Sequence, residues 1–496
     1  MTPTLDWTRR RLTPANLVGL ALLSSIFAKS MAERLSEHDL WWHLKTGQLI
    51  VATHHIPAID PFSFTVMGKR WVVQQWGSEV ILRVITAVFG LRGIILWRSV
   101  MLLCVYGVVA WLFVRVGGNS LGTWAILSLA AYAGAPFWIE RPTLFSLLIF
   151  AVVFQLVVRR SPHVWLCIPL FLLWANLHAV VILGLGFMIL VSGTEAFKSA
   201  LGVDDIKWAR RLSLVTLGCL VASFVNPYGP KLLVYAVGLT HTVSSTAAEW
   251  GSPDFHQILF LPFLLLVLLS FVVLAFSSKR PDFTDVVLIA AFLGLGLYAE
   301  RNLPFSAVVI GFVTVKYAPA FARGAADKKD EKSGRPASMP LVPALAIITA
   351  IALGLGALVW HRFPRSDSLQ AVSDRGFPVA TIASIPGSGV RLFADDRWAG
   401  LVIYMRWPGT HVAFDGRGDL YGKEIIARYN QTIAGGPGWE SWLNQICATH
   451  VLIQEKGGLA NVIEASPDWR VVRRDPIADA QAVLLSRDRA SPGCPP

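Results

Sequence analysis

The stretch SEHDLWWHLKTGQLIVATHHIPAIDPFSFT, residues 36–65, packs two aspartates, four histidines and two adjacent tryptophans into thirty residues. It follows an apolar segment, residues 15–31, which three arginines precede at positions 9–11. A basic start before an apolar run resembles a signal peptide, but many hydrophobic segments follow. We therefore interpret residues 15–31 as a retained membrane anchor. The amino terminus is then cytoplasmic, and residues 36–65 emerge on the outer side.

The composition predicts a polytopic α-helical membrane protein. Of the 496 residues, 54% are hydrophobic and only 15% are charged, with a mean hydropathy of +0.54, whereas soluble domains carry about 25% charged residues. A membrane helix needs about 20 mostly apolar residues. We predict eleven spans, at residues 15–31, 94–115, 121–138, 143–158, 164–176, 178–194, 211–225, 257–276, 283–299, 303–320 and 340–360. The stretch 163–196 fits one long span or two short ones, and two preserve the alternation of the later loops.

Charge is distributed unevenly along the chain. Residues 361–496 hold 15 Lys and Arg against 14 Asp and Glu, so nearly all of the net charge of +12 lies in residues 1–360. The basic residues sit in short alternate loops, such as 159–160, 198–211, 279–280 and 323–335. This is the pattern of cytoplasmic loops in membrane proteins, and it gives no support for a nucleic-acid partner.

Residues 361–496 differ from the rest of the chain and predict a soluble α/β domain outside the cytoplasm. Strand-like pieces such as VRLFADD, GLVIYM, HVAFDGR, HVLIQEK and WRVVRRD alternate with helix-like pieces. We therefore divide the chain into a membrane domain, 1–360, with a long first outer loop, 35–79, and a tail domain, 361–496. Cys447 and Cys494 lie in this tail and can pair only if it faces an oxidising compartment.

Polar residues gather at the predicted outer ends of the spans. Ionisable groups at a membrane border are costly and often mark function, so their position on one side predicts a single outer cavity. The candidates are Glu37, His38, Asp39, Trp42, His43, Asp60, Arg141, His178, Lys231, Glu249, Arg301 and Asn302.

These residue types suit transfer of a group from a lipid phosphate. Arg141, Lys231 and Arg301 are placed to hold a phosphate at the membrane surface, where guanidinium binds phosphate with two donors. Asp39 and Asp60 are candidate bases for a hydroxyl nucleophile. Trp42 offers a flat face to a sugar ring or an anchor at the headgroup level.

Each candidate also has a structural interpretation. Asp39 is well placed to cap the helix that LWWHLKTGQLI suggests, and Asp60 before Pro61 suits a turn. Arg141 and Arg301 each follow a glutamate with which they could pair. His178 could be a helix-packing residue, and FDGRGDL in the tail fits a tight turn after a strand.

Several motifs resemble those of the GT-C membrane glycosyltransferases. A short first span and a long outer loop with an early acidic residue are shared features. DLWWHLKTGQLI, IPAIDPFSFT and GKRWVVQQWGSEV, followed by ERPTLFSLL, LLWANLHA, NPYG, EWGSPD and ERNLPFSA, resemble a bacterial GT-C-like group of largely unassigned substrate. The tail motifs AGLVIYM and VAFDGRGDLYG resemble its tail domain. The resemblance implies a polyprenyl-phosphate sugar donor and a first-loop aspartate as general base, here Asp39.

The predicted function is that of an inverting glycosyltransferase at the outer face of the bacterial inner membrane, with a periplasmic tail. The expected partners are a polyprenyl-phosphate-linked sugar, membrane lipids and a lipid, glycan or protein acceptor. The chain lacks a tight pair of acidic residues beside Asp39, which leaves a divalent cation such as Mg or Mn open as cofactor. The alternatives are a transporter or flippase for lipid-linked sugars and a non-catalytic glycan-assembly factor.

Overall fold

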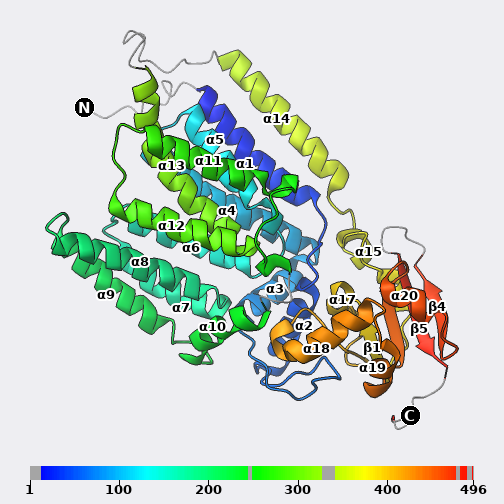
Figure 1. Cartoon of the computed structure of the whole chain (residues 1–496). Coiled ribbons are helices and arrows are strands. Elements are labelled where there is room, and N and C mark those ends of the chain that lie inside the picture. Colours follow the sequence, from blue (N-terminus) through cyan, green and yellow to red (C-terminus); the bar gives the residue numbers. More distant parts are fainter. Residues whose placement is uncertain (1–12, 244–247, 327–340, 476–480, 489–493, 495–496) are drawn as a thin grey trace.

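A computed structural model describes residues 13–243, 248–326, 341–475, 481–488 and 494. A large bundle of helices is followed by a small domain built around a sheet (Figure 1). The helices that follow the bundle's apolar segments are α1 (Pro14–Ala32), α4 (Arg92–Gly117), α5 (Leu121–Ala133), α6 (Thr143–Val158), α7 (Cys167–Leu177), α8 (Val181–Ala200), α9 (Ile206–Ala222), α11 (Leu261–Phe276), α12 (Phe283–Tyr298), α13 (Leu303–Ala326) and α14 (Leu341–Arg362).

Each predicted span falls on one of these helices. Within the described residues, five helical segments are long and apolar enough to cross a membrane: Pro14–Ala32, Arg92–Gly117, Val181–Ala200, Ile258–Phe276 and Pro343–Arg362. The number of eleven spans stays a prediction. The stretch 163–196 forms two separate helices, α7 and α8, which a break at residues 178–180 divides. Most of the basic loop 323–335 lies outside the described residues.

The first outer loop holds two helices, α2 (Leu40–Thr53) and α3 (Trp76–Phe89), and a further helix, α10 (Lys231–Val243), lies between α9 and α11. Helix α2 packs closely on α3. The contact leaves no room for a side chain at Gly47, which would collide with the backbone carbonyl of Glu79. The loop thus forms a compact layer on the bundle instead of an extended linker. This layer carries residues 36–43, the first candidates from the sequence.

The tail domain contains the strands β1 (Val390–Ala394), β2 (Thr410–Val412), β3 (His450–Gln454), β4 (Trp469–Arg474) and β5 (Ala482–Arg487). They form one sheet in the order β2-β1-β3-β5-β4, in which β2, β1 and β3 are parallel and β5 runs antiparallel to both of its neighbours. Its helices are α15 (Leu369–Val372), α16 (Val379–Ala383), α17 (Asp396–Arg406), α18 (Gly418–Ile433), α19 (Trp439–Gln445) and α20 (Gly458–Ile463).

Two strand predictions in the tail need correction. The piece GLVIYM is not a strand but part of helix α17, whose residues Trp398–Ile403 are all buried. An unbroken apolar run does not distinguish a buried strand from a helix packed on both sides, and Asp395 caps this one by accepting from the Arg397 amide. Strand β5 was not predicted, although it pairs on both sides within the sheet.

The tail domain packs directly on the first outer loop. Helix α17 lies on α2 so closely that a side chain at Gly400 would meet the backbone carbonyl of His38. The Trp407 indole donates to the Pro61 carbonyl at 2.9 Å, and Ser63 forms a bridge with Val412 of β2. The tail therefore covers the polar stretch with which the sequence began. The domain boundary predicted at residue 360 stays a prediction. The first outer loop and the tail domain pack together, although this boundary separates them in the sequence.

Candidate functional site

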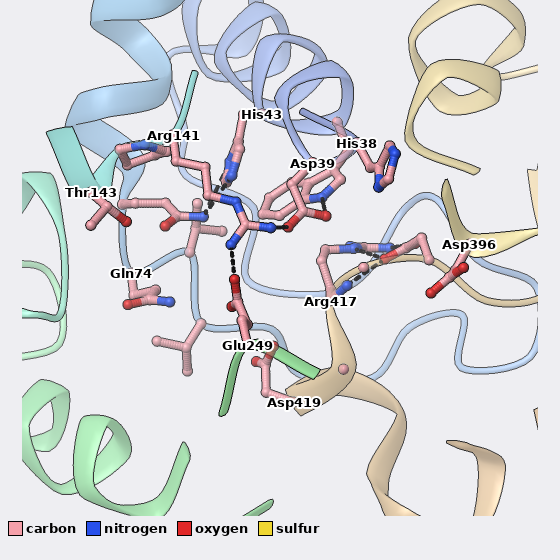
Figure 2. A pocket seen from close by; sticks show the side chains of 18 of the residues that line it. His38, Asp39, His43, Gln74, Arg141, Thr143, Glu249, Asp396, Arg417 and Asp419 are labelled. Atoms are coloured by element: carbon pink, nitrogen blue, oxygen red, sulfur yellow. Dashed lines mark hydrogen bonds and ion pairs between the residues drawn. The ribbon is translucent and has the colours of Figure 1, made fainter. Parts of the chain in front are cut away.

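A polar cavity of about 460 Å³ lies where the bundle, the first outer loop and the tail domain meet (Figure 2). The lining residues belong to α2, residues 71–79, residues 141–143 at the start of α6, residues 249–250, Arg301 and the tail loop 414–419. Segments that are far apart in the sequence thus meet at one place. We use the name outer cavity for this space.

Arg141 is the centre of the charged groups in this cavity. Its guanidinium forms ion pairs with three carboxylates from different segments: Glu37 at 2.8 Å, Asp39 at 3.5 Å and Glu249 at very short range. Glu249 also pairs with Arg301 at 3.3 Å. The cluster therefore has two arginines and three carboxylates.

The pairing of these arginines differs from the structural alternative in the sequence. Neither arginine pairs with the glutamate that precedes it among the described ion pairs: Glu140 is buried against Arg98 of α4, and Arg301 pairs with Glu249. Glu140 is not available to Arg141, because its buried carboxylate already pairs with Arg98 and accepts the backbone amide of Glu37.

Asp39 is the N-cap residue of α2, but its side chain makes no capping hydrogen bond. It accepts instead from the indole of Trp42 at 3.0 Å, and Arg141 lies on its other oxygen. Gly416 of the tail approaches it so closely that an added Cβ would lie 1.9 Å from an Asp39 oxygen. The side chain is about one quarter exposed, at 23%. The predicted cap is therefore not formed, and the carboxylate faces the cavity.

Glu37 lies beneath Asp39 and is almost fully buried. Burial raises the pKa of its carboxyl from 4.5 to about 7, although Arg141 opposes this shift and Asp39 adds to it. Its carboxylate also accepts the backbone amide of Asp39 at 3.1 Å. A group that titrates near neutral pH is thus coupled to the position of both Arg141 and Asp39.

A second pair of titratable groups lies deeper in the cavity wall. His43 Nδ1 and a Glu79 oxygen are 3.0 Å apart, and the amide of Gln75 lies against the same ring at 3.1 Å. Burial lowers the pKa of His43 and raises that of Glu79, so both are favoured in their neutral forms. The other oxygen of Glu79 is buried without a hydrogen-bond partner. Glu79 is not among the residues predicted from the sequence, since it lies inside the amphipathic helix α3.

The tail loop 415–419 supplies the facing wall. Arg417 is buried and binds Asp415 through two nitrogens, at 2.8 and 2.6 Å, and Asp60 at 2.7 Å. Asp60 also accepts the backbone amides of Phe62 and Ser63. Asp60 is thus fully occupied and does not line the cavity, which fits a positioning role better than the predicted base. The turn predicted for FDGRGDL in fact carries an ion-pair network.

An apolar groove of about 470 Å³ adjoins the outer cavity between α8 and α12. The two spaces share Gln74, His178, Trp250 and Arg301 as lining residues. The Arg301 guanidinium lies over the ring of Trp250, 4.3 Å from its centroid. Arg301 is therefore the cation at the border between a polar and an apolar space.

The predicted site residues fall into three groups. Those that line the outer cavity are His38, Asp39, Trp42, His43, Arg141, His178, Glu249 and Arg301. Glu37 supports this wall through Arg141, and Asn302 lines the apolar groove. Lys231 is exposed at the start of α10 and lines neither space, so the structure separates it from the cluster. The sequence around Lys231 does not show in which direction helix α10 runs, so this separation could not be predicted.

The carboxylates around Asp39 do not suit a divalent cation. Glu37, Asp39 and Glu249 all face the Arg141 guanidinium, whose charge opposes a metal ion at the same oxygens. Within the described ranges, no group of three or more His, Cys, Asp or Glu side chains is arranged to hold a metal. We therefore assign no step to a metal ion.

The fold is similar to that of several solved membrane proteins. The oligosaccharyltransferase of Archaeoglobus fulgidus in its apo form matches with a TM-score of 0.58 at 12% identity, over 90% of this chain and 70% of that chain. AglB of the same organism, in complex with an inhibitory peptide and a dolichol-phosphate, matches with a TM-score of 0.56 at 11% identity, over 88% of this chain and 69% of that one.

ArnT from Cupriavidus metallidurans, bound to undecaprenyl phosphate, matches with a TM-score of 0.50 at 12% identity, over 95% of this chain and 97% of that chain. These neighbours are GT-C membrane glycosyltransferases, so the resemblance seen in the sequence is confirmed at the level of the fold. No protein-family model matches the sequence, and no curated protein matches it.

Proposed function

We propose that this protein transfers a sugar from a polyprenyl-phosphate donor to a hydroxyl of a lipid, glycan or protein acceptor at the outer face of the inner membrane. One observation carries the proposal: a polar cavity with a carboxylate joins an apolar groove, and Arg301 stands at the border. Such a pair of spaces fits an amphiphilic molecule with a charged junction. The fold neighbours bound to dolichol-phosphate and undecaprenyl phosphate support this class of donor.

In this proposal the donor lies across the two spaces. Its prenyl chain occupies the apolar groove between α8 and α12, and its phosphate meets Arg301. Arg301 has one carboxylate partner, Glu249 at 3.3 Å, and can exchange it for phosphate oxygens. Arg141 already has three carboxylate partners, so we assign it the positioning of Asp39, Glu37 and Glu249 in place of the predicted phosphate contact.

Asp39 is the proposed base for the acceptor. Its carboxylate takes the proton of the acceptor hydroxyl, whose oxygen then bonds to C1 of the sugar while the bond from C1 to the phosphate oxygen breaks. Polyprenyl phosphate leaves with the bonding electron pair, and attack from the opposite side inverts C1. The Trp42 indole and Arg141 hold Asp39 from two sides, which restricts the carboxylate to one orientation.

The test is transfer by the purified protein in nanodiscs. Undecaprenyl-phosphate-linked hexoses are supplied together with envelope membranes from the organism that produces the protein, and both released undecaprenyl phosphate and sugar bound to acceptor are measured. Stoichiometric appearance of both is expected. Donor binding with neither product would instead favour the assembly factor, and movement of the intact donor across vesicle membranes would favour the flippase.

The middle of the bundle gives a reason to prefer transfer over transport. Phe150 of α6 packs against Phe187 of α8, Phe292 of α12 and Phe305 of α13, with ring centroids 5.3 to 5.7 Å apart. Phe187 and Phe292 also line the apolar groove. Aromatic rings, which give a sugar headgroup no hydrogen-bond acceptors or donors, therefore border the groove towards the middle of these helices.

The tail domain is proposed to lie in the periplasm. A disulfide joins Cys447 and Cys494, and disulfides persist mainly in oxidising compartments. The tail also closes the outer cavity, so both must lie on the same side of the membrane. Reporter fusions after residue 370 test this placement: activity of a reporter that works only in the periplasm is expected, and activity of a cytoplasm-only reporter would contradict it.

A further inference from the structure

A second polar cavity, of about 320 Å³, lies inside the tail domain where β1 and β3 end. Both strands are parallel neighbours, but the chain leaves them in opposite directions: β1 leads to β2 on one side, and β3 leads towards β4 on the other. In open parallel sheets, the crevice outside the strand ends at such a reversal is where ligands bind. We call this space the tail cavity.

The tail cavity adjoins the outer cavity. Asp396, Arg397 and Asn430 line both spaces, and Arg397 and Gln454 also line a third cavity of about 300 Å³, which reaches His38. The three spaces therefore adjoin one another through shared wall residues, and we call this series of spaces the groove. It runs from the surroundings of Asp39 across the carboxyl edge of the tail sheet.

The side chains of the tail cavity suit hydroxyl groups. Asp395 takes two guanidinium bonds of Arg397, at 2.8 and 2.5 Å, and the neighbouring Asp396 lines both the tail cavity and the outer cavity, where Figure 2 shows it. Burial, and then Asp395, raises the pKa of Asp396 to about 6, so at pH 7 it is mostly ionised and accepts hydrogen bonds. The amides of Asn430 and Gln454 both donate and accept.

The tail cavity also has aliphatic lining. Ile433 and Leu459 line it together with the polar side chains, so it offers contacts to C–H groups as well as to O–H groups. A sugar ring presents both kinds of surface. The negative charge of Asp396 disfavours a polyanion in the same place.

A peptide fits this groove less well. Extended peptides usually bind by pairing with the edge of a sheet. The edge strands here are β2 and β4, whereas the tail cavity stands at the ends of the inner strands β1 and β3. The backbone groups of the inner strands are already used within the sheet.

We propose that the tail cavity and the groove that leads from it bind an oligosaccharide chain whose reacting end reaches Asp39. This rests on the proposed function and makes it more specific, because it names a glycan as the acceptor class. The three adjoining spaces, of about 460, 320 and 300 Å³, offer more room than a single small alcohol needs, which favours a chain of several sugar units.

The test is retention of glycans by the full-length protein in nanodiscs. The probe is the oligosaccharide mixture released from envelopes of the organism that produces the protein, labelled at the reducing end with 2-aminobenzamide. We expect the wild type to retain chains of several sugars. Gln454→Ala should weaken retention about threefold to tenfold, the usual effect of one lost hydrogen bond. Ala434→Trp, which fills the tail cavity, should weaken it by at least about tenfold.

Gln445→Ala is the matched control, because this amide at the end of α19 lines none of the three cavities. It should retain glycans as the wild type does. Equal retention by all four proteins, retention of peptides in place of glycans, or no retention by the wild type would overturn the inference. Binding of undecaprenyl phosphate, measured by native mass spectrometry on the same samples, is expected to be equal in all four. Its loss in the wild type would count against the proposed donor and not against the glycan site.

Discussion

Helix α8 connects two charged clusters of similar composition and different use. Near its start lies the outer cluster, with Arg141 and Arg301 against Glu37, Asp39 and Glu249. At its other end lies the inner cluster, with Arg160 and Lys198 against Glu195, Asp204 and Asp282. Each cluster holds two cations and three carboxylates. Twenty helical residues separate their ends, a length of about 30 Å, close to the thickness of a membrane core.

The surrounding space distinguishes the two clusters. Lys198 contacts all three carboxylates of the inner cluster, at 3.0 to 3.1 Å, and this cluster lines none of the cavities described above. It holds α8, α9 and the start of α12 together. In the outer cluster, Asp39 and Arg301 face open space that a substrate can occupy. Buried charge alone therefore does not mark a site; charge that borders a cavity does.

The largest expected effect tests whether the outer cluster is catalytic. Asp39→Asn should lower the transfer rate roughly 10²–10⁴-fold, the usual contribution of a general base. Donor binding should remain, because the amide oxygen can still accept from Trp42. Initial rates and native mass spectrometry measure the two quantities. Asp204→Asn removes a matched carboxylate of the inner cluster and should leave the rate unchanged. Near-normal turnover in Asp39→Asn would move the base elsewhere, with the deeper Glu79 next to be examined.

A second substitution displaces Asp39 without removing it. In Gly416→Ala the new methyl group would lie 1.9 Å from an Asp39 oxygen, and the end of that side chain can move aside at little cost to the fold. Misplacement of a reacting group by about 1 Å can lower a rate by about 10²-fold. We expect a loss of that order with an unchanged melting temperature. Gly387→Ala in the same domain meets open space and is the control. Full activity in Gly416→Ala would show that the position of Asp39 is not critical.

The third effect separates the two arginines of the outer cluster. Arg301→Lys should weaken undecaprenyl phosphate binding about tenfold to a hundredfold, since loss of a charged, two-pronged contact costs about 1.5–3 kcal/mol. Arg141→Lys should change the transfer rate more than donor binding, because its guanidinium contacts three carboxylates. Lipid titration in nanodiscs and initial rates give both values. Equal donor affinity in wild type and Arg301→Lys would favour a purely structural pair with Glu249.

The smallest effect concerns pH. Glu37 holds Arg141 only when ionised, and the pKa of Glu37 is raised from 4.5 to about 7. As the pH falls from 8 to 6, Arg141 should lose this partner, and the transfer rate should fall by up to about tenfold, in proportion to ionised Glu37. Glu37→Gln should show a low rate without this inflection.

Unfolding does not explain such a profile. Burial disfavours the charged form of Glu37 in the folded chain, so its ionisation lowers the free energy of unfolding as the pH rises from 4.5 to about 7. Acidification over this range therefore does not destabilise the fold through Glu37. Glu37→Gln should therefore not lower the melting temperature at pH 8. A rate profile with the same inflection in wild type and Glu37→Gln would assign the titration to another group.

The sequence by itself determined the class of the protein and the region of its site. Runs of about 20 apolar residues exclude water as the solvent of the predicted spans between residues 15 and 360, and a costly polar stretch at the end of such a run indicates a function for it. Asp39, His43, Arg141, Glu249 and Arg301 could be selected as candidates in this way, since each lies in a segment predicted to be on the outer side. These inferences depend on local composition, which the sequence shows directly.

Only the tertiary structure decided how these groups are used. It turned Asp39 from a helix cap into a cavity carboxylate, and it enclosed Asp60 with Arg417, 357 positions away in the chain. It also brought Glu79 and Asp396 to the same walls and made GLVIYM a helix. Each outcome depends on which distant segment packs against the residue. Burial, the choice of ion-pair partner and the shape of a cavity all depend on such long-range contacts. The local spacing of residues along the chain does not predict these contacts.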